Sequence, residues 1–179
     1  RGSLRSQITW LRCVCLSVVV ILVVGGITRL TGSGLSMVDW RPIAGILPPI
    51  TDNQWNEVFQ MYQASPEYQK VNQGMSLSDF KFIFFWEYLH RILGRIVGLL
   101  CLVPYLYFLI RGKLSPRMKV FGLTLIGLVV GQGLMGWYMV KSGLVNNPEV
   151  SHYRLAAHLS LAFSVFGLAW WMMLSLGRG

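Results

Sequence analysis

Four apolar segments, each long enough to cross a lipid bilayer, constrain this sequence more than any other feature. A helix needs about 20 residues to cross ~30 Å of hydrocarbon, and the segments run approximately over residues 11–30, 86–110, 118–140 and 153–176. Only helices and closed barrels satisfy their backbone in lipid, and these segments hold too few turn residues for barrel strands. With 54% hydrophobic residues, the chain is predicted to be an all-α integral membrane protein. We expect one membrane domain, residues 1–179, built as an antiparallel four-transmembrane-helix bundle.

The basic residues predict how these spans are oriented. They cluster before the first span, between the second and third, and after the fourth: Arg1, Arg5, Arg12, Arg111, Lys113, Arg117, Lys119 and Arg178. The other two connections mix both signs of charge, so the positive-inside rule places both termini on the cytoplasmic or matrix side. The net charge of +9 is therefore mainly a topology signal. A nucleic-acid partner is excluded, because the charges are not gathered on a soluble module.

The long outer loop, residues 31–85, is too patterned to be a simple linker. Asp52 is predicted to cap a short helix that carries aromatic residues at helical spacing. Ser65-Pro66-Glu67 predicts a second helix start, with a cap, a proline at the first helical position and an acid in the first turn. Ser76 and Asp79 resemble a capping box before the second span. The aromatic residues either lie among lipid headgroups or roof a pocket.

The second span contains ionisable residues, which cost at least a few kcal/mol each at membrane depth unless partners compensate. At about 100° per residue, one face of about 140° carries all of them together with two glycines: Glu87, His90, Arg91, Gly94, Arg95 and Gly98. This face must look into the bundle and away from lipid. The glycines either allow close helix packing or leave room for a flat ligand.

The fourth span repeats this arrangement, with Arg154 one turn outward of His158. His90 lies four residues past Trp86, and His158 lies five past Tyr153. At 1.5 Å per residue, both imidazoles are expected about 6–8 Å below the outer surface.

A faint internal repeat relates the two halves of the chain. Val23–Gly25 matches Val129–Gly131 late in a span, and Ser33–Leu35 matches Ser142–Leu144 in the following outer loop. Both copies run in the same direction, so a symmetry axis would lie along the membrane normal. The repeat predicts a pseudo-twofold bundle with a ligand on that axis.

Two imidazoles at one depth on alternate helices suit the two axial positions of a haem iron. Arg154, with Arg91 or Arg95, would then meet the propionates near the aqueous edge. The alternative is that each histidine snorkels or bridges helices, and the residues alone leave both interpretations open. A di-iron carboxylate site is excluded, because Glu87 is the only acid within the spans. Gln132 in the third span is expected to serve helix packing more than ligand contact.

Sequence motifs along nearly the whole chain resemble the haem A synthase family. They are Gly25–Thr31, Ser33–Trp40, Phe80–Ile83, Glu87–Arg91, Gly133–Gly143 and Tyr153–His158. The similarity is greatest to the mitochondrial and alpha-proteobacterial branch, since the outer loop lacks the cysteine pair of another branch. Members of the family are generally eight-helix proteins made of two similar halves, and this chain resembles the amino-terminal half.

The resemblance implies an oxidoreductase that oxidises the C8 methyl of haem O to a formyl group, giving haem A for cytochrome c oxidase assembly. His90 and His158 would be the axial ligands of the substrate haem O, and Glu87 would be the catalytic acid beside the reacting carbon. Arg91, Arg95 and Arg154 would contact the bound haem. A haem b cofactor is expected in the second half, without which we expect haem binding and little catalysis.

The resemblance also implies location and partners. The location is the mitochondrial inner membrane or the bacterial cytoplasmic membrane, and the partners are haem O, membrane lipid and an unidentified electron donor. Haem O synthase and oxidase assembly factors are further candidate partners. Two alternatives remain open from the residues: a non-enzymatic b-type cytochrome with four helices, and a haem-free half of a transporter.

Overall fold

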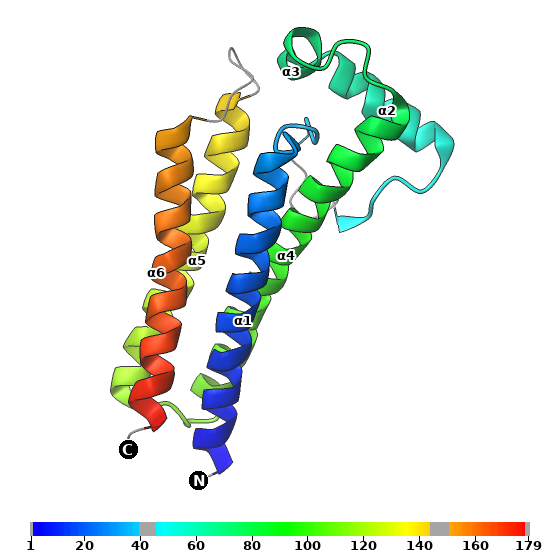
Figure 1. Cartoon of the computed structure of the whole chain (residues 1–179). Helices are drawn as coiled ribbons and strands as arrows, with labels where there is room; N and C mark the ends of the chain where they lie inside the picture. The colour runs from blue at the N-terminus through cyan, green and yellow to red at the C-terminus, as the bar shows by residue number, and fades with distance from the viewer. Residues whose placement is uncertain (1, 40–45, 144–150, 178–179) are drawn as a thin grey trace. The chain divides into compact units, whose positions relative to one another are not determined.

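The computed structural model describes residues 2–39, 46–143 and 151–177 (Figure 1). Over these residues the chain is helical and has no strand, and its helices are α1 (Gly2–Leu30), α2 (Asp52–Gln63), α3 (Pro66–Lys70), α4 (Leu77–Ile110), α5 (Pro116–Gly143) and α6 (His152–Gly177). Helices α1, α4, α5 and α6 are long and apolar enough to cross a membrane. The prediction of an all-α membrane protein is confirmed. Four residues used above lie outside the described part: Arg1, Trp40, Leu144 and Arg178.

The long helices extend beyond the predicted spans. Helix α1 begins at Gly2 rather than Leu11, and α4 begins at Leu77 rather than Trp86. With 34 residues, α4 is about 51 Å long, well above the ~30 Å of the hydrocarbon core. Its additional turns precede the span, on the side of the long outer loop. Hydropathy misses these turns because it detects only the part of a helix that lies in lipid. The cap predicted at Ser76 is confirmed, since its hydroxyl accepts a hydrogen bond from the backbone N–H of Asp79 at 3.1 Å.

The two short helices of the outer loop begin at capping residues. Thr51 caps α2, and its side chain accepts a hydrogen bond from the backbone N–H of Gln54 at 3.3 Å. The cap predicted at Asp52 is therefore wrong by one residue, because Thr51 and Gln54 form a capping box and Asp52 is the first helical residue. The predicted start of α3 is confirmed, with Ser65 as its cap and Pro66 as its first residue.

Contacts divide the chain into two units, each described here by itself. Unit 1 comprises Arg1–Leu22, Leu93–Gly136 and Ala156–Gly179, and unit 2 comprises Val23–Ile92 and Trp137–Leu155. All seven acidic residues of the sequence fall in unit 2, together with seven basic ones. The whole net charge of +9 therefore belongs to unit 1.

Unit 1 is held together by a core to which α1, α4, α5 and α6 all contribute. The indole N–H of Trp10 donates to the carbonyl of Leu100 at 2.6 Å, which ties α1 to α4. The hydroxyl of Tyr105 donates to the carbonyl of Lys119 at 3.0 Å, which ties α4 to α5. A Cβ at Gly122 would lie only 2.3 Å from the ring of Tyr105. Helices α4 and α5 can pack this closely because residue 122 has no side chain.

Unit 2 has a separate aromatic core that fastens the outer loop to the first turns of α4. Tyr62 of α2 is completely buried and stacks on Phe80 of α4, with ring centroids 5.0 Å apart. Phe84, one turn further along α4, contacts Trp55 of α2 edge-to-face at 5.1 Å. Such aromatic pairs contribute about 0.5–1.5 kcal/mol each beyond the burial of their area. The outer loop is therefore a packed structure.

Glu67 is buried in unit 2, although carboxylates in outer loops usually face water. Its side chain is 7% exposed, and its Oε2 has no hydrogen-bond partner among the described residues. Burial raises the pKa of Glu67 to about 7, an effect opposed by a hydrogen bond with Tyr62 and increased by the charge of Glu87. Tyr62 in turn accepts a hydrogen bond from the side-chain amide of Asn72 at 2.7 Å. Below neutral pH the carboxyl group of Glu67 is therefore mostly protonated.

The substitution Glu67→Gln is expected to stabilise the protein at about pH 8 and to leave its stability near pH 4 unchanged. The folded state holds the proton of Glu67 more tightly than the unfolded state, so stability is full below the ordinary pKa of 4.5 and falls as pH rises to about 7. The loss is on the order of 3 kcal/mol, and a glutamine does not ionise. Thermal unfolding across this pH range measures the difference.

The matched control for this experiment is Glu57→Gln, since Glu57 is exposed on α2. The control is expected to follow the wild-type pH dependence. If Glu67→Gln also followed the wild-type curve, the buried carboxyl would not be the titrating group.

Candidate functional site

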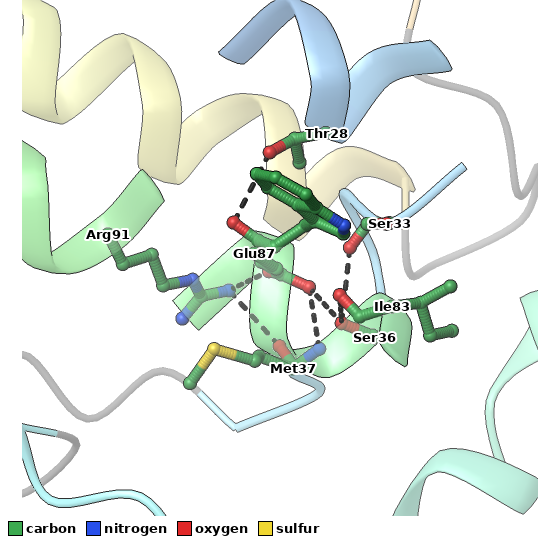
Figure 2. Close-up of polar contacts among 8 residues, drawn as sticks. Thr28, Ser33, Ser36, Met37, Ile83, Glu87 and Arg91 are labelled. Carbon is green, nitrogen blue, oxygen red and sulfur yellow. Dashed lines mark hydrogen bonds and ion pairs between the residues drawn. The ribbon is translucent and has the colours of Figure 1, made fainter. Parts of the chain in front are cut away.

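Glu87 lies at the centre of a hydrogen-bond network in unit 2, between α4 and the segment that follows α1 (Figure 2). It is 3% exposed. Its Oε2 accepts hydrogen bonds from the hydroxyl of Ser36 at 2.6 Å and from the backbone N–H of Met37 at 2.8 Å. Its Oε1 lies 2.6 Å from a guanidinium nitrogen of Arg91, one helical turn further along α4. Both carboxylate oxygens are thus held in place by donors.

The segment around Ser36 is fixed by the same network. Ser33 and Ser36 are almost fully buried, and the Ser36 hydroxyl also lies 3.1 Å from the carbonyl of Ser33 and 3.4 Å from that of Ile83. Arg91 donates to the carbonyl of Met37 at 3.2 Å. The ion pair therefore also anchors the outer loop to α4. The sequence marked Ser33–Leu35 as part of a repeat and Ser33–Trp40 as a family motif, but it did not identify Ser36 or Met37 as partners of Glu87.

The network explains how a carboxylate is tolerated at this depth. A buried ion pair is stable only if hydrogen bonds satisfy its remaining polar atoms, and Glu87 receives them from a hydroxyl, a backbone amide and a guanidinium. Charge-assisted hydrogen bonds of this length are the strong ones. The carboxylate of Glu87 is therefore held in a fixed position on α4, one turn before His90.

His90 lies against α1 in unit 2. An added Cβ at Gly25 would be 3.0 Å from Cε1 of the His90 ring, so the imidazole occupies space that any other residue at position 25 would fill. Close by, the hydroxyl of Thr28 lies 2.8 Å from the carbonyl of Val24 and 3.3 Å from that of Trp86 on α4. Helices α1 and α4 therefore meet at the level of His90, and Gly25 makes room for the ring.

His158 has a matching environment in unit 1. An added Cβ at Gly136 of α5 would be 3.3 Å from Cε1 of the His158 ring. The side-chain amide nitrogen of Gln132 lies 3.4 Å from Nε2 of His158. Nδ1 of His158 and Oε1 of Gln132 are buried and have no hydrogen-bond partner among the described residues. A buried polar atom without a partner is rare and points to a missing ligand or water.

His90 and His158 thus each pack on a glycine of the preceding long helix. The sequence repeat matched Gly25 with Gly131, but Gly131 has no side chain within 4 Å of its added Cβ. The glycine that faces a histidine is Gly136, five residues further along α5 and therefore on a different face of the helix. Gln132 contacts His158 between α5 and α6, and the packing role expected for it stays a prediction. The sequence did not identify Gly25 and Gly136 as the neighbours of the histidines, because a glycine in a span shows no sign of which residue faces it.

The three arginines predicted to meet propionates lie in different surroundings. Arg91 is engaged with Glu87 and Met37, as described above. Arg154 of α6 donates to the hydroxyl of Ser142 and lies over the ring of Tyr138 at 5.1 Å. Arg95 is partly buried on α4 in unit 1. Among the described residues, no group of three or more histidine, cysteine or carboxylate side chains could hold a metal ion without further ligands.

Comparison with known proteins connects this geometry to a family. The model of the COX15-CtaA family, described as cytochrome oxidase assembly protein, matches residues 8–179. The chain belongs to this family. Among curated members, it is 52% identical over 175 residues to the heme A synthase of Nitrosospira multiformis and 49% identical over 177 residues to that of Paramagnetospirillum magneticum. The alignments cover 95% and 98% of this chain and 49% of each relative.

A third relative in the family, the heme A synthase of Rickettsia bellii, is 50% identical over 164 residues, or 92% of this chain and 49% of the relative. The chain therefore spans about half the length of the curated relatives it matches. No solved structure matches the chain.

Proposed function

We propose that this chain is the substrate-haem part of a heme A synthase, an oxidoreductase that converts haem O to haem A for cytochrome c oxidase. The observation that carries the proposal is the identity of about 50% to proteins named heme A synthase over more than nine-tenths of the chain. The relatives are about twice as long, which leaves room for a second haem site of b type in a further segment. No observation favours the alternative of a non-enzymatic cytochrome.

His90 and His158 are the proposed axial ligands of the haem O iron. Two local features support them, a glycine that leaves space beside each imidazole and, for His158, a buried ring nitrogen that no described residue satisfies. Neutral imidazole nitrogen is a common ligand of haem iron. Arg95 and Arg154 are proposed to contact the propionates. Arg91 contributes through Glu87, because its guanidinium is already engaged there.

Glu87 is the proposed catalytic residue. Oxidation of a porphyrin methyl to a formyl group removes electrons and protons from that carbon and adds an oxygen atom, which water or dioxygen must supply. A nearby carboxylate can stabilise the positive charge or accept a proton. The structure supports the electrostatic role, since donors from Ser36, Met37 and Arg91 hold both oxygens of Glu87 in fixed positions. Preorganised charge of this kind needs no rearrangement during the reaction.

The proposed location is the bacterial cytoplasmic membrane or the mitochondrial inner membrane. Both termini would face the cytoplasm or matrix, because the basic residues cluster at that end of the spans. The site network would then lie near the outer surface. Haem O synthase, oxidase assembly factors and an electron donor are the proposed partners.

The proposal is tested by extracting haem from the protein after production in a host that makes haem O and lacks its own heme A synthase. We expect reversed-phase chromatography to show haem O bound to the 179-residue chain, with little haem A. Production together with the remaining half found in the relatives is expected to give haem A. Recovery of protohaem alone in both preparations would favour the b-type cytochrome and reject the proposal.

A further inference from the structure

An apolar groove runs between α1 and α6 in unit 1, away from the residues discussed so far. Its cavity volume is about 280 Å³, and its walls include Arg12, Leu16 and Val19 of α1 and Phe166, Trp170 and Met173 of α6. Leu16 is 67% exposed and Trp170 is 46% exposed. The groove is therefore open at the surface of the unit, although nearly all of its lining is apolar.

The groove follows the direction of the helices. Arg12 to Val19 and Phe166 to Met173 are each seven residues apart, so each wall is about 10 Å long at 1.5 Å per residue. Arg12 lies 18 residues before the outer end of α1 at Leu30, which corresponds to about 27 Å. This distance puts Arg12 near the inner edge of a ~30 Å hydrocarbon core. Leu16 and Val19 then lie within the core.

Arg12 is a cation without a partner in its own unit. It is exposed, and it makes no hydrogen bond, ion pair or aromatic contact with any residue in the described part of the chain. Unit 1 contains no aspartate or glutamate at all. A counter-charge for Arg12 therefore has to come from outside the unit, and at this depth the lipid phosphate is the nearest plentiful anion.

We infer that the groove binds one anionic phospholipid of the inner leaflet, with its phosphate at Arg12 and an acyl chain along Leu16, Val19 and Phe166. The shape supports a lipid because a cationic end at the interface continues into an apolar channel in the core. Basic pockets between transmembrane helices on the cytoplasmic or matrix side bind such headgroups. A protein helix is about 10–12 Å wide with its side chains and would need a longer face than these two turns.

The inference is tested by native mass spectrometry of the purified chain with phosphatidylglycerol or phosphatidylcholine added to the detergent. The wild type is expected to retain one phosphatidylglycerol about fivefold more tightly than phosphatidylcholine, the preference that one basic residue gives at an anionic surface. Arg12→Gln is expected to remove this preference. Arg5→Gln, the same charge change two turns earlier on α1 and outside the groove, is the matched control and should retain it.

A second variant keeps the charge and fills the groove. Leu16→Trp should reduce retention of both lipids while Arg12 remains in place. Quenching of tryptophan fluorescence by phosphatidylglycerol with brominated acyl chains should be weaker in Trp170→Phe than in the wild type. An unchanged lipid preference in Arg12→Gln would overturn the inference, and so would a dimer that covers the groove without lipid. Neither outcome depends on haem, so this test is independent of the proposed function.

Discussion

In protein produced together with the remaining half found in the relatives, replacing His158 with Ala is expected to abolish haem A formation and to lower retention of haem O by more than about 100-fold. Loss of a metal's outer-shell partner alone costs about 10–100-fold, and an axial ligand is bound directly. The ring also fills the space beside Gly136, so its removal leaves that space to solvent or lipid. The measurement is haem content per protein together with the absorption spectrum, which should lose the signature of two nitrogen ligands. His90→Ala, which removes the imidazole in unit 2, is expected to give the same result.

The matched control for these variants is His152→Ala. His152 is the first residue of α6 and is exposed, as expected for a histidine at the membrane edge. Its replacement should leave haem content and spectrum unchanged. Normal haem A formation in both His90→Ala and His158→Ala would reject the axial-ligand assignment, whatever their effect on stability.

Replacing Glu87 with Gln is expected to lower the rate of haem A formation by about 10²–10³, the usual cost of removing a preorganised electrostatic group. Haem O should remain bound, because a glutamine side chain has the same shape and its oxygen can still accept from Ser36 and Met37. The negative charge is lost, and Arg91 no longer has a counter-ion. Turnover and haem retention, measured on the same preparations, separate the two effects.

Two further variants show whether the effect belongs to the charge of Glu87. Asp79→Asn removes an exposed carboxylate at the start of α4 and should change neither quantity. Ser36→Ala removes one donor to Glu87 and keeps the charge, so it should cost less than Glu87→Gln. If haem retention and turnover fell together in Glu87→Gln, the residue would serve only to anchor the outer loop.

Some structural features could be predicted because their causes are local. The free energy of transferring a segment into lipid depends on the residues of that segment alone, so all four spans were located from the sequence. The cap at Ser65 was found because capping depends on residues within one turn. The pair Ser76 and Asp79 likewise predicted where α4 begins, at Leu77. The start of α1 at Gly2 was missed, since the turns outside the hydrocarbon are not apolar enough to be detected.

The candidate site was only partly predictable. The polar face of the second span identified Glu87, His90 and Arg91, because ionisable groups in a membrane span are costly and usually have a function or a partner. Nothing in the spacing showed that Glu87 pairs with Ser36 and Met37, which lie 50 residues or more before it. Such contacts depend on how the outer loop folds back onto α4.

The sequence by itself determined the class of the protein, the number of spans, and which ionisable or metal-binding side chains lie within each span. The tertiary structure decided which donors hold Glu87, which glycines face the histidines, and that Arg12 borders a groove. The physical reason is that hydrophobicity and helix capping depend on residues that are close together in the sequence. Hydrogen bonds and close packing instead depend on which turns of different helices meet, and that is set only when the helices pack.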